Sequence, residues 1–252
     1  MSSQEEALGY QAVLLDIEGT TTSIRFVYDV LFPFALKEAA GYIERHWNQE
    51  DTQALLNSFR EQVADDIRSG MTEVAQIAPP NAADMEIKES WSKNISWQMG
   101  QDRKSTCLKA LQGRIWNAGY EDGRLEGHVY PDVAKAFQIW KTRKIPIYIY
   151  SSGSVAAQKL LFNRSKSGDL TQFIDGYFDT TTGPKRAQES YVAIAEATGH
   201  SPDEILFVTD IWEEAEAAAQ AGMGTVISLR PGNKELPPHK HREIKSLTDL
   251  IC

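Results

Sequence analysis

The sequence predicts an α/β protein in which a helical domain is inserted after the first strand of a doubly wound parallel sheet. Three observations predict this fold. The first apolar run ends abruptly in acidic and glycine residues, a long block without β-rich runs follows, and apolar runs then alternate with helix-like segments. We expect an α/β core at residues 8–22 and 128–252, and a helical cap at residues 23–127.

The first expected strand covers residues 11–15 and stops at Asp16, Glu18 and Gly19. A short continuous apolar run of this kind is typical of a strand buried on both faces. The block that follows has helical spacing of its apolar residues. Its helices are expected at residues 28–46, 51–68 and 105–116, with a break at 78–84 and a glycine-rich return loop at 119–127.

The alternation of strands and helices resumes at residue 131. We expect strands at 145–150, 205–209 and 225–229, and helices at 131–141, 154–162, 186–197 and 212–221. Ligands of such sheets bind beyond the carboxyl ends of the strands. The polar residues that follow the apolar runs are therefore candidates for a site, namely Asp16, Glu18, Ser151, Ser152 and Asp210.

The overall composition argues against several classes of function. A net charge of −9 argues against a broad basic surface for nucleic acid, because phosphate binding needs clustered lysine and arginine. Two cysteines, Cys107 and Cys252, indicate neither a disulfide framework nor a thiolate metal site. The first residues lack a signal-peptide pattern, and no apolar stretch is long enough to span a bilayer. We expect a cytoplasmic protein, with the nucleus as a further location, that binds neither nucleic acid nor membranes.

These acids suit the hydrolysis of a phosphate ester. A doubly charged phosphoryl group repels a carboxylate nucleophile until a cation screens it, and Mg²⁺ accepts carboxylate oxygens from neighbouring strands. Asp16 and Asp210 are expected to hold that cation. Ser151 offers hydroxyl and amide donors to phosphate, and Lys185 offers a positive charge.

Asp16 is then the expected nucleophile, forming an aspartyl-phosphate. Glu18 lies two residues further on and is expected to protonate the leaving oxygen and later to activate water. Gly19 lets the chain turn sharply, so that both carboxylates face one pocket.

Each of these residues also has an ordinary structural interpretation. Asp16 and Glu18 could form a solvated turn, and Asp210 could cap the helix that begins near Trp212. Ser151 and Ser152 could end a strand and cap the next helix, and Lys185 could be an exposed lysine. The position of the acids after buried strands and the order of the motifs favour the catalytic interpretation.

The same residues carry a resemblance to a known family. Four motifs resemble, in chain order, those of the haloacid dehalogenase superfamily: Asp16-x-Glu18-Gly-Thr, Ser151-Ser-Gly-Ser154, Lys185 and Thr209-Asp210. Glu18 departs from the usual pattern, which has Asp at this position. With Glu there, the stretch Leu-Leu-Asp-Ile-Glu-Gly-Thr-Thr is similar to the enolase-phosphatases of methionine salvage, the acireductone synthases.

The resemblance implies a Rossmann-like core with a cap and one site that performs two reactions. The implied substrate is 2,3-diketo-5-methylthiopentyl 1-phosphate, which is enolised and then dephosphorylated to 1,2-dihydroxy-3-keto-5-methylthiopentene. The implied enzyme is a monomer with one Mg²⁺ per subunit. The implied roles are nucleophile and metal ligand for Asp16, acid/base group and metal ligand for Glu18, metal ligand for Asp210, and substrate binding for Ser151, Ser152 and Lys185. For Glu18, the main-chain carbonyl or the carboxylate could contact the metal.

Two alternatives remain open at this stage. The chain could be a Mg²⁺-dependent phosphatase of the same superfamily for another small phosphate, such as a sugar phosphate, because the cap sets specificity. It could also be a binding protein that keeps the fold without turnover. The complete set of acids, serines and lysine argues against the second alternative.

Overall fold

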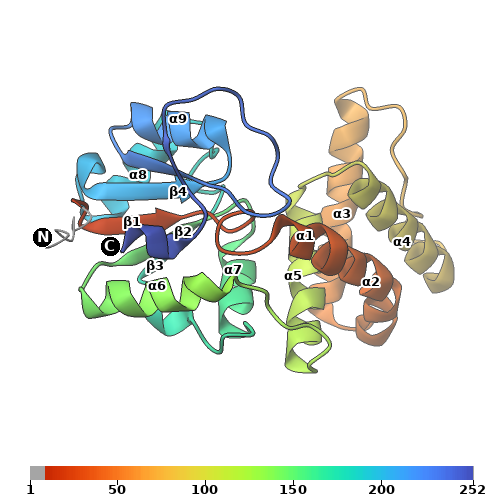
Figure 1. Cartoon of the computed structure of the whole chain (residues 1–252). Coiled ribbons are helices and arrows are strands. Elements are labelled where there is room, and N and C mark those ends of the chain that lie inside the picture. The colour runs from red at the N-terminus through yellow and green to blue at the C-terminus, as the bar shows by residue number, and fades with distance from the viewer. Residues whose placement is uncertain (1–8, 252) are drawn as a thin grey trace, which may run out of the picture. The chain divides into compact units, whose positions relative to one another are not determined.

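The protein, described here by a computed structural model for residues 9–251, contains a six-stranded sheet in the order β3-β2-β1-β4-β5-β6 (Figure 1). Every neighbouring pair of strands in it is parallel. The strands are β1 (Ala12–Leu15), β2 (Ile147–Tyr150), β3 (Gly176–Phe178), β4 (Ile205–Thr209), β5 (Gly224–Ser228) and β6 (Arg242–Ile244). Residues 8 and 252, which the expected core includes, lie outside the described residues.

Strand β1 lies in the interior of the sheet and is fully buried. Its side chains alternate between two apolar clusters: Val13 and Leu15 belong to one, and Ala12 and Leu14 belong to the other. Helices α6 and α7 contribute to the first cluster, and α8 and α9 to the second (Figure 1). The bounds are α6 (Pro131–Thr142), α7 (Val155–Asn163), α8 (Gln188–Thr198) and α9 (Trp212–Gln220). The expected doubly wound sheet, with helices on both faces, is thus confirmed.

The described chain divides into two compact units. The first unit combines the chain up to Val27 with the chain from Glu126 onward, and the second spans Tyr28–Leu125. The cap expected at residues 23–127 is therefore slightly wider than the second unit. Short helix α1 (Ile24–Phe26) belongs to the first unit, where Phe26 packs against the sheet cluster.

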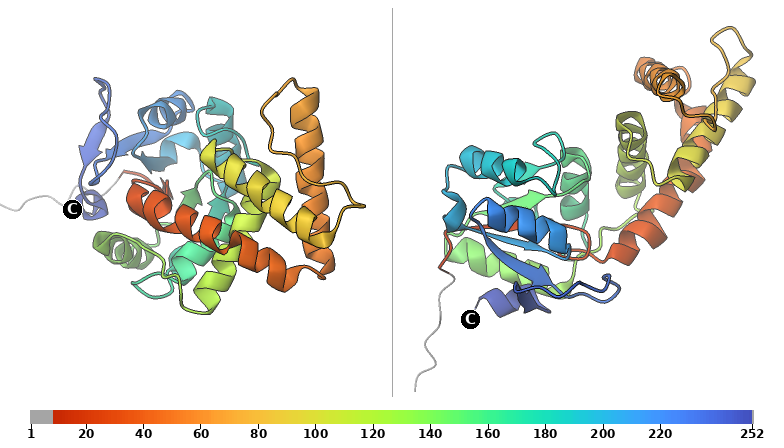
Figure 2. Two further views of the ribbon diagram at one scale, coloured as in Figure 1. Left: turned by 90° about the vertical axis from the view of Figure 1, so that its right-hand side faces the viewer. Right: turned by 90° about the horizontal axis from the view of Figure 1, so that it is seen from above.

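The second unit is helical in all of its regular structure (Figure 2). It contains α2 (Phe32–His46), α3 (Glu50–Arg68), α4 (Asp84–Gly100) and α5 (Thr106–Glu121), preceded by a π-helical turn at Val27–Leu31. Its core is built around Trp91, which is fully buried and packs edge-on against Phe59. None of the described helices combines the length and apolar character that crossing a membrane requires.

One expected loop is partly helical. The glycine-rich stretch 119–127 was expected to be irregular, but α5 continues to Glu121, so the prediction is wrong for its first three residues. A Cβ atom on Gly119 would lie 2.6 Å from the ring of Phe34. This glycine therefore permits close packing inside the second unit, and it does not mark a turn.

A buried ion pair joins distant parts of the first unit. The Arg230 guanidinium donates to both carboxylate oxygens of Asp132, at 3.0 and 2.7 Å, and to the main-chain oxygen of Thr20 at 3.1 Å. Asp132 also accepts a hydrogen bond from the Leu247 amide at 2.7 Å. Burial alone would raise the pKa of Asp132, yet the hydrogen bonds from Arg230 and Leu247 outweigh it and hold the pKa below its usual value.

Replacing Asp132 with Asn is expected to lower the free energy of unfolding by about 3 kcal/mol at pH 7, because Arg230 is left buried without its counter-charge. A carboxyl whose pKa is lower in the folded state stabilises the fold above its unfolded pKa of about 4. That contribution is lost as the pH falls through the folded-state pKa. Urea unfolding at pH 7 and pH 3 should therefore show a smaller difference between variant and parent at pH 3.

Asp203→Asn, at an exposed position, serves as the control for this substitution. A deficit for Asp132→Asn that is equal at pH 7 and pH 3 would show that the carboxylate charge is not its source.

Candidate active site

The site lies at the carboxyl edge of the sheet, where β1, β2 and β4 end side by side. Asp16 follows β1 directly, is 2% exposed, and its amide donates to the Val208 carbonyl at 2.9 Å. Ser151 and Asp210 follow β2 and β4 in the same way and are also buried. Parallel strands deliver their following residues to one edge, so residues far apart in sequence meet here.

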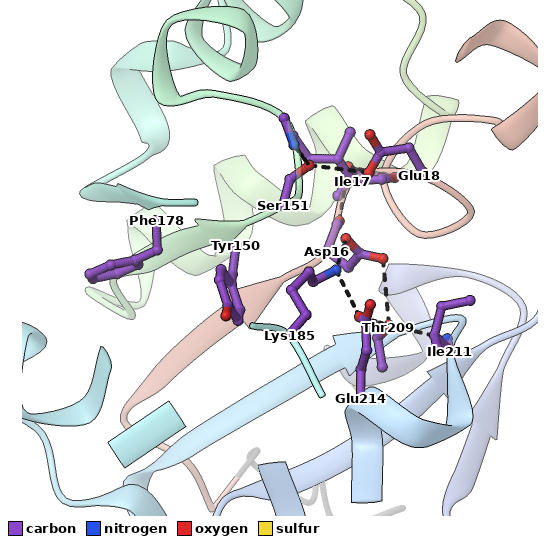
Figure 3. Close-up of polar contacts among 12 residues, drawn as sticks. Asp16, Ile17, Glu18, Tyr150, Ser151, Phe178, Lys185, Thr209, Ile211 and Glu214 are labelled. Carbon is purple, nitrogen blue, oxygen red and sulfur yellow. Dashed lines mark hydrogen bonds and ion pairs between the residues drawn. The ribbon is translucent and has the colours of Figure 1, made fainter. Parts of the chain in front are cut away.

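Lys185 holds the Asp16 carboxylate. Its ammonium lies 2.5 Å from Asp16 Oδ1 and 2.7 Å from Glu214 Oε2, and its side chain is 9% exposed (Figure 3). The Tyr191 hydroxyl donates to the Lys185 carbonyl at 2.6 Å, and the ring of Tyr150 lies 5.7 Å from the ammonium. The interpretation of Lys185 as an exposed surface lysine is therefore wrong.

Glu214 also belongs to this group. It lies in the first turn of α9 and is 8% exposed. The Thr209 hydroxyl donates to Glu214 Oε2 at 2.9 Å and accepts a hydrogen bond from the Ile211 amide at 3.1 Å (Figure 3). The one sequence signal for Glu214 is its spacing of four residues from Asp210.

Glu18 and Ser151 form a second contact across the site. The Ser151 hydroxyl donates to Glu18 Oε2 at 3.2 Å and accepts from the Gly153 amide at 3.1 Å (Figure 3). Ser152 lies half-buried in the same turn. Ser154, rather than the two candidate serines, caps α7 through its hydroxyl. Ser151 is therefore not used as a helix cap.

Asp210 is close to the turn that follows Asp16. It is 7% exposed, and α9 begins after Ile211 without a side-chain cap, so Asp210 is not the capping residue. Gly19 has a φ of 74°, and a Cβ atom there would lie 2.2 Å from Asp210 Oδ2. Glycine is thus required at this position by the left-handed backbone and by the nearby carboxylate.

The site holds more buried acids than positively charged groups. Burial, and then the charges of Asp16 and Glu214, raise the pKa of Asp210 to about 8. Burial raises the pKa of Glu214 to about 7, although Lys185 opposes the shift. Burial and the charge of Asp16 also raise the pKa of Glu18. Among the described residues, Lys185 forms ion pairs with Asp16 and Glu214, and its charge also opposes the rise in the pKa of Asp210 and Glu18. Four acids thus lie around one ammonium, so the site favours an additional cation.

This donor set fits Mg²⁺ in one specific way. Across residues 9–251, no three His, Cys, Asp or Glu side chains are grouped as metal ligands. A cation would therefore use two carboxylates, from Asp16 and Asp210, with water and main-chain oxygens in the other positions. The carboxylate of Glu18 accepts a hydrogen bond from Ser151, and its main-chain carbonyl is a further oxygen of the same turn.

Comparison with known proteins places the chain in a family. Residues 10–222 match the model of the haloacid dehalogenase-like hydrolases. The chain is 47% identical to enolase-phosphatase E1 of Anopheles gambiae over 247 residues, which cover 96% of this chain and 83% of that protein.

A second relative and a solved structure extend this comparison. The chain is 43% identical to a probable bifunctional methylthioribulose-1-phosphate dehydratase/enolase-phosphatase E1 of Vitis vinifera, over 99% of its own length and 48% of the plant protein. It thus spans about half of that relative. The crystal structure of the UTR4 protein of Saccharomyces cerevisiae matches with a TM-score of 0.76 and 33% identity, over 94% of this chain and 98% of the yeast chain.

The family resemblance noted in the sequence is therefore confirmed over nearly the full length of the chain. The chain belongs to the haloacid dehalogenase-like hydrolases and, within them, to the enolase-phosphatases.

Proposed function

We propose that this chain is a Mg²⁺-dependent enolase-phosphatase of methionine salvage that acts on 2,3-diketo-5-methylthiopentyl 1-phosphate. It enolises this substrate and then releases phosphate, giving 1,2-dihydroxy-3-keto-5-methylthiopentene. The observation that carries the proposal is the pair of acids after β1, in which Asp16 is held by Lys185 and Glu18 by Ser151.

The names of the plant relatives support the substrate. They join an enolase-phosphatase to a methylthioribulose-1-phosphate dehydratase. Loss of water from a methylthioribulose 1-phosphate leaves a methylthiopentyl diketone that keeps its 1-phosphate. A chain similar to about half of such a protein is suited to consume that diketone.

Asp16 acts as the nucleophile in the phosphatase step. A carboxylate oxygen attacks phosphorus, the bond from phosphorus to the substrate oxygen breaks, and an aspartyl-phosphate forms. Lys185 orients the Asp16 carboxylate and offsets the negative charge that gathers around the phosphoryl group. Ser151 and Ser152 offer hydroxyl and amide donors to the phosphoryl oxygens, and water then hydrolyses the aspartyl-phosphate.

Glu18 moves the protons. Burial and the charge of Asp16 raise the pKa of Glu18, which favours the carboxylic acid, so it can protonate the leaving oxygen and afterwards, as the carboxylate, activate the attacking water. In the enolisation step the Glu18 carboxylate removes a proton from C1 of the diketone, and the C2 oxygen takes a proton from water. Ser151 holds the carboxylate in place for the enolisation step.

Asp16, Asp210 and the main-chain carbonyl of Glu18 would hold one Mg²⁺. When bound, this cation supplies charge that stabilises both the enolate and the phosphoryl group. The proposal includes a monomeric enzyme in the cytoplasm. The low cysteine content supports a reducing compartment such as the cytoplasm.

The decisive test is to mix the protein, Mg²⁺ and the diketone phosphate, and to follow the ultraviolet absorbance of the enol and free phosphate separately. An absorbing intermediate that precedes phosphate release is expected. Phosphate release from a sugar phosphate, with no such intermediate from the diketone, would identify a simple phosphatase. Absence of turnover with both substrates would favour a binding protein.

Shortening Glu18 to Asp is expected to slow enol formation about 100-fold, because the carboxylate then lies roughly 1 Å too far from C1. Hydrolysis of p-nitrophenyl phosphate should change much less, because its leaving group needs no proton. Stopped-flow absorbance measures the first rate, and nitrophenolate release measures the second. Equal rates for the variant and the parent in both assays would show that the length of Glu18 has no special role.

A further inference from the structure

The loop between β5 and β6 holds the turn that carries Glu18. Its residue Arg230 donates to the Thr20 carbonyl at 3.1 Å, and its residue Asn233 donates to the Gly19 carbonyl at 3.0 Å. Two successive carbonyls after Glu18 are therefore bound by one loop. Because an ion pair with Asp132 fixes the position of Arg230, the loop holds the turn in place.

The orientation of the Asn233 amide is determined by its partners. Its Nδ2 donates to the Gly19 carbonyl and to the Ser228 carbonyl, both at 3.0 Å. Two carbonyl oxygens require the nitrogen of the amide, so Oδ1 must point the other way. This Oδ1 is buried and has no hydrogen-bond partner.

The unpartnered oxygen faces the acids of the site. The position that a Cβ atom on Gly19 would take lies 2.9 Å from Asn233 Oδ1 and 2.2 Å from Asp210 Oδ2. The two oxygens are thus neighbours on the same side of the turn. Both are acceptors when Asp210 is ionised, as a metal ligand is, and a buried acceptor without a donor is unfavourable. A donor between them would therefore be stabilising.

A water molecule bound to a cation is such a donor. Mg²⁺ retains several of its waters in protein sites, and these waters donate strongly to nearby oxygens. Partners of this kind orient the ligands of a metal and strengthen its binding. Thr20 Oγ1, in the turn after β1, and Ser228 Oγ, at the end of β5, are also buried without partners, which is consistent with water in this region.

We propose that Asn233 is a positioning residue for the metal site. Its Nδ2 fixes the turn after Glu18, and its Oδ1 accepts a hydrogen bond from a water molecule bound to Mg²⁺ beside Asp210. The inference rests on the Mg²⁺ dependence in the proposed function and adds a residue outside the four family motifs.

Two substitutions separate the two halves of this role. Asn233→Asp keeps an acceptor oxygen near Asp210 but removes the amide donor, whereas Asn233→Leu removes both. Asn57→Leu, at an exposed position on α3, is the matched control. Circular dichroism and urea unfolding in EDTA report the loss of the loop contact, which should destabilise both Asn233 variants and leave the control unchanged.

Calorimetric titration with Mg²⁺ alone, without substrate, tests the role of Asn233 Oδ1 as a hydrogen-bond acceptor. Asn233→Leu is expected to weaken Mg²⁺ binding about 10- to 100-fold. Asn233→Asp should bind at least as tightly as the parent, because it presents an additional negative oxygen. Equal weakening in both variants, or unchanged binding in Asn233→Leu, would overturn the inference. Absence of Mg²⁺ binding by the parent protein would instead overturn the metal assignment in the proposed function.

Discussion

Replacing Asp16 with Asn is expected to reduce phosphate release about 10⁴-fold, the largest effect expected of any single substitution in this protein. The amide has the shape of the carboxylate but is a much weaker nucleophile, so the aspartyl-phosphate does not form. In the variant, Lys185 and Thr209 still contact oxygen and nitrogen atoms of similar size at this position. Phosphate release from the diketone phosphate, measured at saturating Mg²⁺, checks the prediction.

The control for this variant is Asp203→Asn, which makes the same chemical change at an exposed position and should leave activity unchanged. Circular dichroism should show that the Asp16 variant is folded. Full activity of Asp16→Asn, in a preparation free of other phosphatases, would mean that a different residue is the nucleophile.

Replacing Lys185 with Met should have the next largest effect, because it acts on both activity and stability. Without the ammonium, Asp16 and Glu214 remain buried as unpaired acids, which is expected to lower the free energy of unfolding by about 3 kcal/mol. Loss of charge beside the phosphoryl group should slow its transfer about 10³-fold. Urea unfolding and phosphate release measure the two effects.

The free energy of unfolding of the Lys185→Met variant is expected to change with pH in a defined direction. Acids whose pKa is higher in the folded state than in the unfolded state destabilise the fold when they are ionised. Glu214 and Asp210, with pKa values raised to about 7 and about 8 in the parent, are such acids. The stability deficit of the variant should therefore shrink as the pH falls from 8 to 5.

Lys135→Met, at an exposed position on α6, is the control for the loss of a lysine. The Lys185→Arg variant keeps the charge and should recover part of the stability. If Lys185→Met is as stable as the control at pH 8, the ion pairs of Lys185 do not support the fold.

The interior strands were predictable because burial on both faces of the sheet requires a continuous apolar run in the sequence. β4 lies where the apolar run predicted it, and β1 and β2 differ from their predicted ranges at the first residues. β3 and β6 were not predicted. Each has three residues and is only partly buried, so neither produces a continuous apolar run.

The site residues also divide into those that the sequence predicts and those that only the structure reveals. Asp16, Ser151 and Asp210 were predictable because each follows a buried strand and parallel strands end at one edge of the sheet. Lys185 does not directly follow a predicted strand. It lies between β3 and α8, and its contact with Asp16 depends on the path of that segment. Asn233 was missed because it lies in a loop of ordinary polar composition.

The sequence by itself determined the α/β class, the family and the acids that follow the strands, because these depend on local patterns of apolar and acidic residues. The tertiary structure alone decided which groups neutralise, orient and support those acids. Lys185, Glu214, Arg230 and Asn233 act through contacts between segments far apart in the chain. Only the packed fold sets such distances, and the pKa values of the acids depend on them and on burial.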